Sequence, residues 1–229
     1  MSGERDIDGA PGDVSDPAQI RMEFVLRMRE RGVANLDVLR ALETVPRENF
    51  VPRRYSDLAW RDLSLPIACG QVMPEPYIVA RMMEALELSA DHEVLEIGAG
   101  SGYSTAILAR LAGTVVSYER YRTLALEAQG RLAAAGIDNV ALHCGDGLAA
   151  DGVEGQFDRI VIHLSLQEIP QQFLSRLKPG GRIVAARPVQ AGQEAGLYLV
   201  ASAGDGSRDE KFVVRVRYPA PETGVAAAL

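Results

Sequence analysis

Residues 94–104 read VLEIGAGSGYS, a hydrophobic strand that runs directly into glycines at 98, 100 and 102 and then into a helix. After the first strand of a doubly wound sheet, such a turn lets a ligand approach the backbone closely, because side chains at Gly98, Gly100 and Gly102 would block it. The stretch therefore predicts an α/β fold with a ligand site at the carboxyl edge of its parallel strands.

The surrounding pattern supports this fold class. Five short β-rich runs, with helix-length stretches at 101–111 and 121–135 between them, are predicted at 93–97, 114–118, 140–144, 159–163 and 182–186. Alternation of this kind specifies a parallel sheet with helices on both faces. Two further runs, 197–203 and 211–218, have only GDGSRDE between them, which favours a hairpin. The sheet is therefore predicted to be mixed, with an antiparallel end.

The segment before the sheet is predicted to be largely helical. Apolar residues at helical spacing indicate one helix that ends at Gly32, a second near 36–42 and a third from Pro76 to Leu88. Residues 1–17 carry few apolar side chains and have five Asp or Glu against one Arg, so we expect a flexible acidic tail. We expect residues 18–229 to form one domain, in which a helical and substrate-loop region (18–90) precedes the α/β core (91–229).

Composition narrows the classes of function. The 229 residues are 47% hydrophobic and 24% charged, as in soluble globular proteins, and no apolar run is long enough to span a membrane. A net charge of −7 argues against nucleic acid as a partner. The N-terminus lacks a signal-peptide layout, so we expect a cytoplasmic protein. Two cysteines and three histidines fit no metal-ligand spacing, and we expect no metal. The sequence leaves the oligomeric state open.

Acidic residues near the glycine turn indicate which ligand it holds. Glu119 ends the next strand, where a carboxylate can accept from both hydroxyls of a ribose, and Asp146 and Gly147 follow the third strand, where Asp146 can reach an adenine amine. A dinucleotide fingerprint would need glycine at Tyr103. Glu96, inside the strand, suits a ligand that carries sulfonium and ammonium groups. These features favour S-adenosylmethionine over a dinucleotide.

From Met22 to Tyr218 the chain resembles the protein-L-isoaspartate O-methyltransferase family. Beside the glycine turn, the resemblance rests on VLRALETVPRENFVP (38–52), LPIACGQ (65–71), PYIVARMMEAL (76–86), SRLKPGGRIVA (175–185) and VRVRYP (214–219). It implies a Rossmann-like methyltransferase fold and an S-adenosylmethionine-dependent enzyme that methylates the free carboxylate of L-isoaspartyl residues in damaged proteins. A carboxylate is already ionised at neutral pH, so this transfer needs alignment and exclusion of water, without a base or a base-orienting pair.

Two departures from the family pattern concern the acceptor. Where the family usually has GQTIS, this chain reads GQVMP at 70–74, which makes Gln71, Val72, Met73 and Pro74 the substrate-loop candidates and removes two hydroxyls. Where the family usually has a threonine and small alanines, this chain has HLSLQ at 163–167. We therefore expect a tighter, less polar pocket.

Two residues of that second segment are weaker site candidates, and other functions stay open. Ser165 could supply a missing donor, whereas His163 is predicted to be a satisfied, half-buried histidine, with a functional role as the second hypothesis. The alternatives are a methyltransferase with another carboxylate or a small-molecule acceptor, and a non-catalytic protein that binds S-adenosylmethionine.

Overall fold

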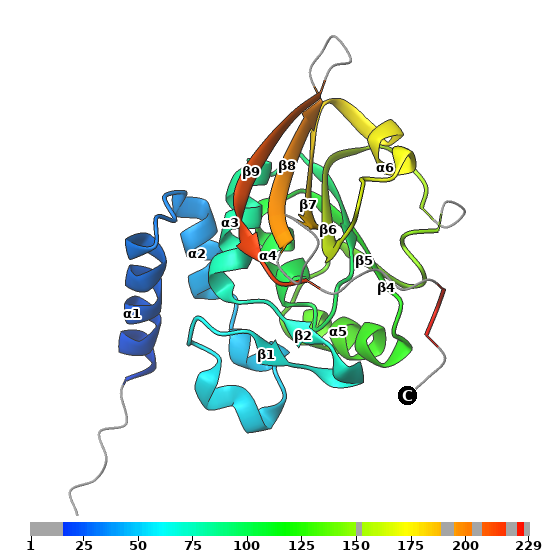
Figure 1. Ribbon diagram of the computed structural model, residues 1–229. Helices are drawn as coiled ribbons and strands as arrows, with labels where there is room; N and C mark the ends of the chain where they lie inside the picture. The colour runs from blue at the N-terminus through cyan, green and yellow to red at the C-terminus, as the bar shows by residue number, and fades with distance from the viewer. Residues whose placement is uncertain (1–15, 150–152, 189–194, 203–207, 219–223, 227–229) are drawn as a thin grey trace, which may run out of the picture.

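The computed structural model describes residues 16–149, 153–188, 195–202, 208–218 and 224–226 (Figure 1). The predicted tail up to residue 15 and the hairpin turn at 203–207 lie outside the described residues. The first helix, α1 (Pro17–Glu30), begins inside the range that was assigned to the tail, because the Asp16 side chain caps it by accepting from the Ala18 N–H.

A seven-stranded mixed sheet forms the centre of the molecule, in the order β5-β4-β3-β6-β7-β8-β9. Its strands are β3 (Glu93–Ile97), β4 (Thr114–Glu119), β5 (Val140–Cys144), β6 (Phe157–Ser165), β7 (Leu177–Pro188), β8 (Ala195–Ser202) and β9 (Arg208–Val216). Neighbours from β5 to β7 are parallel, and β7-β8 and β8-β9 are antiparallel. The predicted mixed sheet is confirmed. Strand order reverses between β3 and β6, which opens a crevice at their carboxyl ends.

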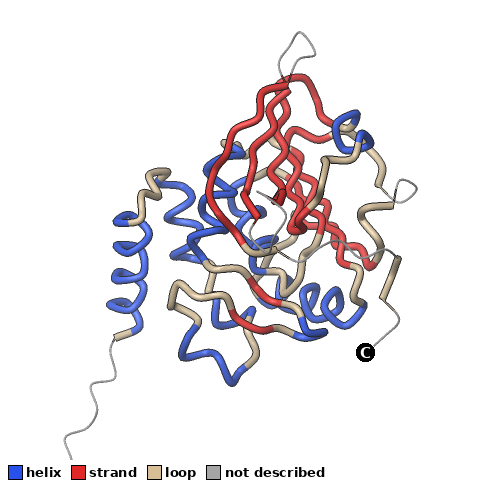
Figure 2. The backbone as a smooth tube through the Cα atoms, in the orientation of Figure 1, coloured by secondary structure: helices blue, strands red, loops and turns tan. Residues whose placement is uncertain are grey.

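The long helices are gathered on one face of this sheet (Figure 2). Residues alternate between faces along a strand: Val94 packs with α3 (Pro76–Leu86), α4 (Tyr103–Leu111) and α5 (Arg122–Ala134), while Leu95 belongs to a second core on the other face. In the described chain, the helix of that second core is the short α6 (Gln171–Ser175), joined by loop residues such as Val153 and Leu166. Helices do lie on both faces, as predicted, but unevenly.

The N-terminal region packs outside α3 and α4. The second helix, α2 (Leu36–Thr44), is capped by Asn35, whose side chain accepts from two backbone N–H groups, and it contacts α1, α3 and α4. Phe24 of α1 is buried, and Trp60 packs edge-on against it. Further along lie η1 (Arg47–Phe50), η2 (Arg53–Leu58), η3 (Ala68–Gly70) and a small antiparallel pair, β1 (Leu65–Pro66) and β2 (Val72–Met73). Between α2 and α3 the chain therefore forms short 3-10 turns and one small ribbon.

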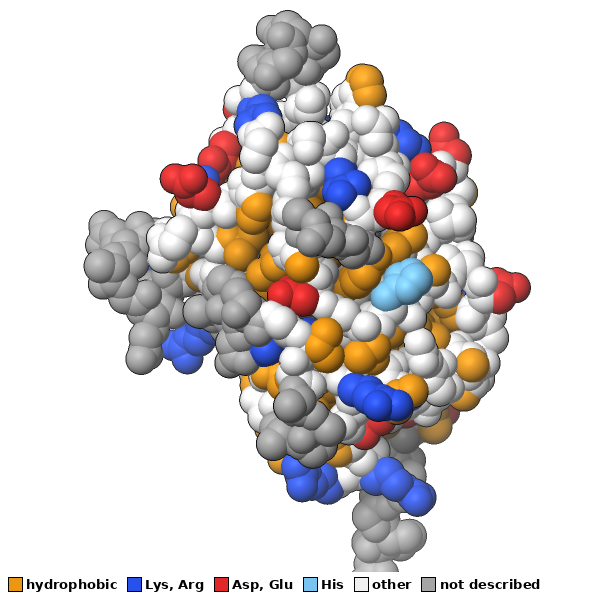
Figure 3. Space-filling model, turned by 90° about the vertical axis from the view of Figure 1, so that its right-hand side faces the viewer, with side chains coloured by type: hydrophobic (Ala, Val, Ile, Leu, Met, Phe, Trp, Pro, Cys, Tyr) orange, Lys and Arg blue, Asp and Glu red, His pale blue; other side chains and the backbone are white. Residues whose placement is uncertain are grey.

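The described surface carries side chains of mixed charge. In Figure 3, acidic and basic side chains are scattered over the visible face, with apolar ones exposed between them and no continuous basic stripe among the described residues. In the described chain, no helix has both the length and the apolar character needed to cross a membrane.

Candidate functional site

The glycine turn after β3 has the geometry that only glycine adopts readily. Gly98, Gly100 and Gly102 have φ of +93°, +56° and +87°. A Cβ on Gly98 would lie 3.3 Å from the His163 Cβ, and one on Gly102 would lie 3.1 Å from the Ala128 Cβ. Backbone conformation and close neighbours thus both favour glycine in this turn, and the approach of a ligand to it stays a prediction.

A pocket opens where the turn meets the crevice between β3 and β6. Including its mouth and the open solvent there, it measures about 990 Å³. The predicted site residues in its wall are Gln71, Val72, Met73, Pro74, Gly98, Gly100, Glu119, Asp146, Gly147 and His163. Three predicted residues are not among those that line it: Glu96, Gly102 and Ser165. The structure thus brings the cofactor candidates and the substrate-loop candidates into one cavity.

Glu119, at the end of β4, is held rigidly in this wall. It is 4% exposed, and its two carboxylate oxygens accept from the backbone N–H groups of Gly100 (2.8 Å) and Tyr121 (2.9 Å). Burial raises the pKa of Glu119, and these two hydrogen bonds partly oppose that rise. Each oxygen retains further acceptor capacity for a ligand.

Asp146, after β5, is also held by backbone groups. One carboxylate oxygen accepts from the Leu148 N–H (3.0 Å) and the other from the Gly224 N–H (2.6 Å). The Arg120 Nε in turn donates to the Gly224 carbonyl (2.9 Å), and Ala226 forms a parallel bridge with Tyr121. A C-terminal segment, residues 224–226, therefore lies beside the pocket. This position could not be predicted from the sequence, because no motif marks the segment.

Glu96 lies behind the pocket wall, in the core. It is fully buried, one oxygen accepts from the Thr105 hydroxyl (2.5 Å) and the Ser117 hydroxyl (2.7 Å), and the other lies 3.0 Å from the His163 Nε2. His163 stands between Glu96 and the cavity. The direct ligand contact predicted for Glu96 stays a prediction, because its carboxylate is not among the groups that line the pocket and its neighbour His163 is.

This Glu96–His163 pair corrects the expectation that the site has no base-orienting pair. The two residues are 67 positions apart, so no local motif contains both. The signal that could have found them is strand register: β3 and β6 pair with Glu96 opposite Val161 and Ile97 opposite Ile162, which places position 163 at the same edge as the glycine turn. A register shift in the pairing of β6 with β7, between Ile162 and Ser165, then changes the direction of the backbone around His163.

The substrate loop, residues 71–74, forms the opposite wall. The Gln71 Nε2 lies 3.3 Å from the Tyr121 hydroxyl, and Met73 is buried, with its sulfur 3.3 Å from the Ser101 hydroxyl. Val72 is 56% exposed. The loop therefore presents backbone groups, Gln71 and apolar side chains to the cavity.

Arg47, in η1, holds this loop from behind. It is fully buried, and its two terminal nitrogens donate to four carbonyls, those of Ala59 (2.9 Å), Arg61 (3.1 Å), Leu63 (2.8 Å) and Pro74 (3.1 Å). Burial lowers the pKa of Arg47 to about 10. In the sequence Arg47 belongs to the PRENFVP stretch, which gives no local indication of this role.

Comparison with known proteins decides the family. The model of the protein-L-isoaspartate(D-aspartate) O-methyltransferase family matches residues 19–224. The chain belongs to this family. Among curated relatives, the protein-L-isoaspartate O-methyltransferase of Nitrobacter winogradskyi is 43% identical over 93% of this chain and 97% of its own length. The resemblance found in the sequence from Met22 to Tyr218 is confirmed.

Solved structures agree with the fold of this family. A protein-L-isoaspartate O-methyltransferase superposes with a TM-score of 0.75 at 25% identity, covering 89% of this chain and 66% of that one. A Plasmodium falciparum structure in complex with S-adenosyl-L-homocysteine gives a TM-score of 0.72 at 18% identity, covering 87% and 97%. The Rossmann-like methyltransferase fold predicted for the chain is therefore confirmed.

Proposed function

We propose that this protein transfers a methyl group from S-adenosylmethionine to the free carboxylate of L-isoaspartyl residues in peptides or proteins. One observation carries the proposal: the glycine turn, Glu119 and Asp146 share a single cavity with the 71–74 loop. A cofactor site and an acceptor loop that open into the same space can hold the two reacting groups next to each other. Membership of the family adds support.

The residues present fit S-adenosylmethionine, which supplies a methyl group activated by a positive sulfonium. Glu119 is fixed with acceptor capacity to spare, as the two hydroxyls of a ribose require, and Asp146 stands at the end of the neighbouring strand to accept from the adenine amine. At Gly147 a Cβ would lie 2.8 Å from the Ile97 Cδ1, so the backbone packs tightly against Ile97 and leaves no room for a side chain there. Glu96 lies behind this wall, where it holds the His163 ring through Nε2.

The remaining demands of the transfer are orientation and exclusion of water. An acceptor carboxylate is ionised at neutral pH, so it attacks without giving up a proton. Apolar side chains in the wall, among them Ile67, Val79 and Leu124, limit the entry of water. Arg47 fixes the Pro74 carbonyl and with it the loop against which the acceptor would rest.

Two further proposals concern the whole chain. We infer that residues 18–229 act as one domain, since a single apolar cluster joins Phe24 and Leu86 to Val94 and Val216. We also propose that the protein works in the cytoplasm, where its free thiols, Cys69 and the exposed Cys144, suit a reducing compartment. The net charge of −7 continues to argue against nucleic acid as a partner.

The test is transfer of labelled methyl groups. The full-length protein is incubated with labelled S-adenosylmethionine and either an isoaspartyl peptide or the matching aspartyl peptide, and base-labile label is counted. We expect label on the isoaspartyl peptide alone. Equal label on both peptides would indicate another acceptor. Binding of S-adenosylmethionine in calorimetry without transfer of label would indicate a non-catalytic binding protein. Absence of S-adenosylmethionine binding would overturn the proposal.

A further inference from the structure

The pocket wall contains a buried pair of ionisable groups that carboxylate methylation does not need as acid or base. The His163 imidazole, 8% exposed, lies 3.0 Å through Nε2 from the fully buried Glu96. Burying two such groups is costly unless their charges are paired and their remaining positions are used. The other ring nitrogen, Nδ1, faces away from Glu96 and is the one that could contact a ligand.

The hydrogen-bond partners of His163 leave room for a proton on each ring nitrogen. Glu96 already accepts from the Thr105 and Ser117 hydroxyls through one oxygen, and its other oxygen lies 3.0 Å from the His163 Nε2, which can donate to it. On the other side, the His163 Nδ1 lies 3.4 Å from the Tyr218 hydroxyl. That hydroxyl lies 3.3 Å from the Met82 sulfur, to which it can donate while its oxygen accepts from a protonated Nδ1. Burial raises the pKa of Tyr218, so the phenol stays neutral.

The His163 imidazole lies in the wall of the pocket that also contains the substrate loop. His163 and Tyr218 both line the pocket, together with the substrate loop. Among the described residues, the wall contains two side chains that can carry positive charge, Arg120 and His163. Arg120 donates to the Gly224 carbonyl, beside Asp146 at the predicted adenosine end. His163 instead follows the β3–β6 crevice and lies against the glycine turn, with a Cβ on Gly98 falling 3.3 Å from its own.

We propose that His163, as an imidazolium held by Glu96, binds the carboxylate of the acceptor. The Nδ1–H exchanges its long contact with Tyr218 for one oxygen of the carboxylate, and the other oxygen attacks the methyl carbon. A C–O bond forms, the C–S bond breaks with its electron pair going to sulfur, and the products are an ester and a neutral thioether. His163 keeps its proton throughout. The proposal rests on the proposed function for the identity of the acceptor.

This role affects binding more than turnover. The carboxylate loses its negative charge as the ester forms, so an imidazolium holds the substrate at least as strongly as the transition state. A charge-assisted hydrogen bond of this kind corresponds to roughly 10- to 100-fold in affinity. Removing it is expected to raise KM for the peptide by that factor and to leave kcat within about threefold.

The experiment compares the wild-type protein with H163Q, whose amide can still donate to Glu96 but carries no charge. Calorimetry on the complex with S-adenosylhomocysteine measures binding of an isoaspartyl peptide and of its neutral carboxamide analogue. We expect H163Q to bind the carboxylate peptide about 10- to 100-fold more weakly, and both proteins to bind the carboxamide equally. The matched control is H92Q, because His92 lies at the opposite end of β3 from the glycine turn and hydrogen-bonds the Ser89 N–H there. It is expected to bind the peptide as the wild type does.

Several outcomes would overturn the proposal. An unchanged peptide affinity in H163Q would mean that His163 has only a structural role. A fall in kcat at unchanged KM would mean that it acts as a base for a different acceptor. If only the affinity for S-adenosylhomocysteine fell, His163 would belong to the cofactor site. Failure of the wild type to bind the peptide would also refute it. If the wild type binds the peptide through His163 but transfers no methyl group, the proposed function fails while this inference stands.

Discussion

Replacing Arg47 by methionine is expected to lower the free energy of unfolding by about 3 kcal/mol. The change removes four hydrogen bonds from a charged donor to the carbonyls of Ala59, Arg61, Leu63 and Pro74, at roughly 1.5 kcal/mol each. Part of this loss is offset, because methionine does not have to be desolvated as a cation. The fall in the pKa of Arg47 from 12.5 to about 10, which is caused mainly by burial, corresponds to a cost of roughly 3 kcal/mol.

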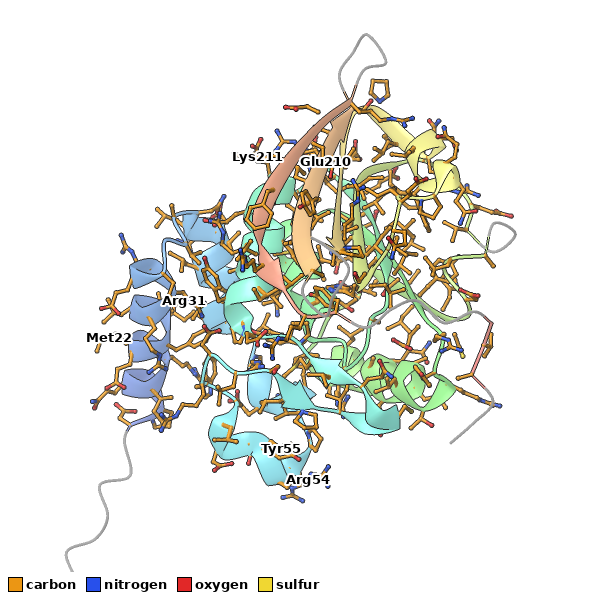
Figure 4. All side chains as sticks on the ribbon, in the orientation of Figure 1. Met22, Arg31, Arg54, Tyr55, Glu210 and Lys211 are labelled. Carbon is orange, nitrogen blue, oxygen red and sulfur yellow. The ribbon has the colours of Figure 1, made fainter. Side chains whose placement is uncertain are left out.

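Urea denaturation followed by far-UV circular dichroism measures this loss. With a slope of about 2 kcal/mol per molar, the midpoint should fall by about 1.5 M. The matched control is R54M: Arg54 is exposed, and Figure 4 shows it on the outer side of η2, pointing away from the body of the protein. Its midpoint should shift by no more than about 0.25 M, corresponding to roughly 0.5 kcal/mol.

The same variant tests the positioning of the substrate loop. Because Arg47 binds the Pro74 carbonyl, R47M should raise KM for the isoaspartyl peptide, while the affinity for S-adenosylmethionine changes little. An R47M midpoint within about 0.5 M of the R54M midpoint would refute the structural argument. An unchanged KM at a lowered midpoint would refute the link to the loop alone.

Three further outcomes are expected. G102A should lower the free energy of unfolding by about 2 kcal/mol, because Gly102 has φ of +87° and an added Cβ would crowd Ala128. G130A, in open space on α5, should raise it by roughly 0.5 to 1 kcal/mol. Urea midpoints that shift in the same direction for both variants would contradict this. E119A should weaken S-adenosylmethionine binding by roughly 10- to 100-fold in calorimetry with the fold intact, and an unchanged Kd would mean that Glu119 does not hold the ribose. Because burial raises the pKa of Glu119 above 4.5, its stabilising contribution is present at low pH and is lost as the pH rises through the folded-state pKa. The stability of the wild type relative to E119Q should therefore fall as the pH rises above the ordinary pKa of 4.5, and a flat difference would exclude the raised pKa.

Much of this protein could be predicted from local sequence. The glycine turn, the alternation of strands and helices, the antiparallel end and the helix from Pro76 each depend on a few neighbouring residues, whose conformational preferences act over short distances. The pocket residues Glu119 and Asp146 were found for the same reason: each follows a predicted strand, and the carboxyl ends of parallel strands meet at one edge.

Tertiary structure alone decided the features that join distant parts of the chain. The contact between Glu96 and His163 depends on the register of β3 against β6 and on the irregularity at the end of β6. The four carbonyls around Arg47 come from loops with no period of their own, and Gly224 reaches Asp146 from 78 residues away. Hydrogen bonds of this kind form between groups that only folding brings together, and no spacing in the sequence encodes their distance. The sequence by itself therefore determined the fold and the edge of the sheet at which the cofactor is predicted to bind. Packing determined which ionisable side chains line the pocket beside the predicted acceptor loop.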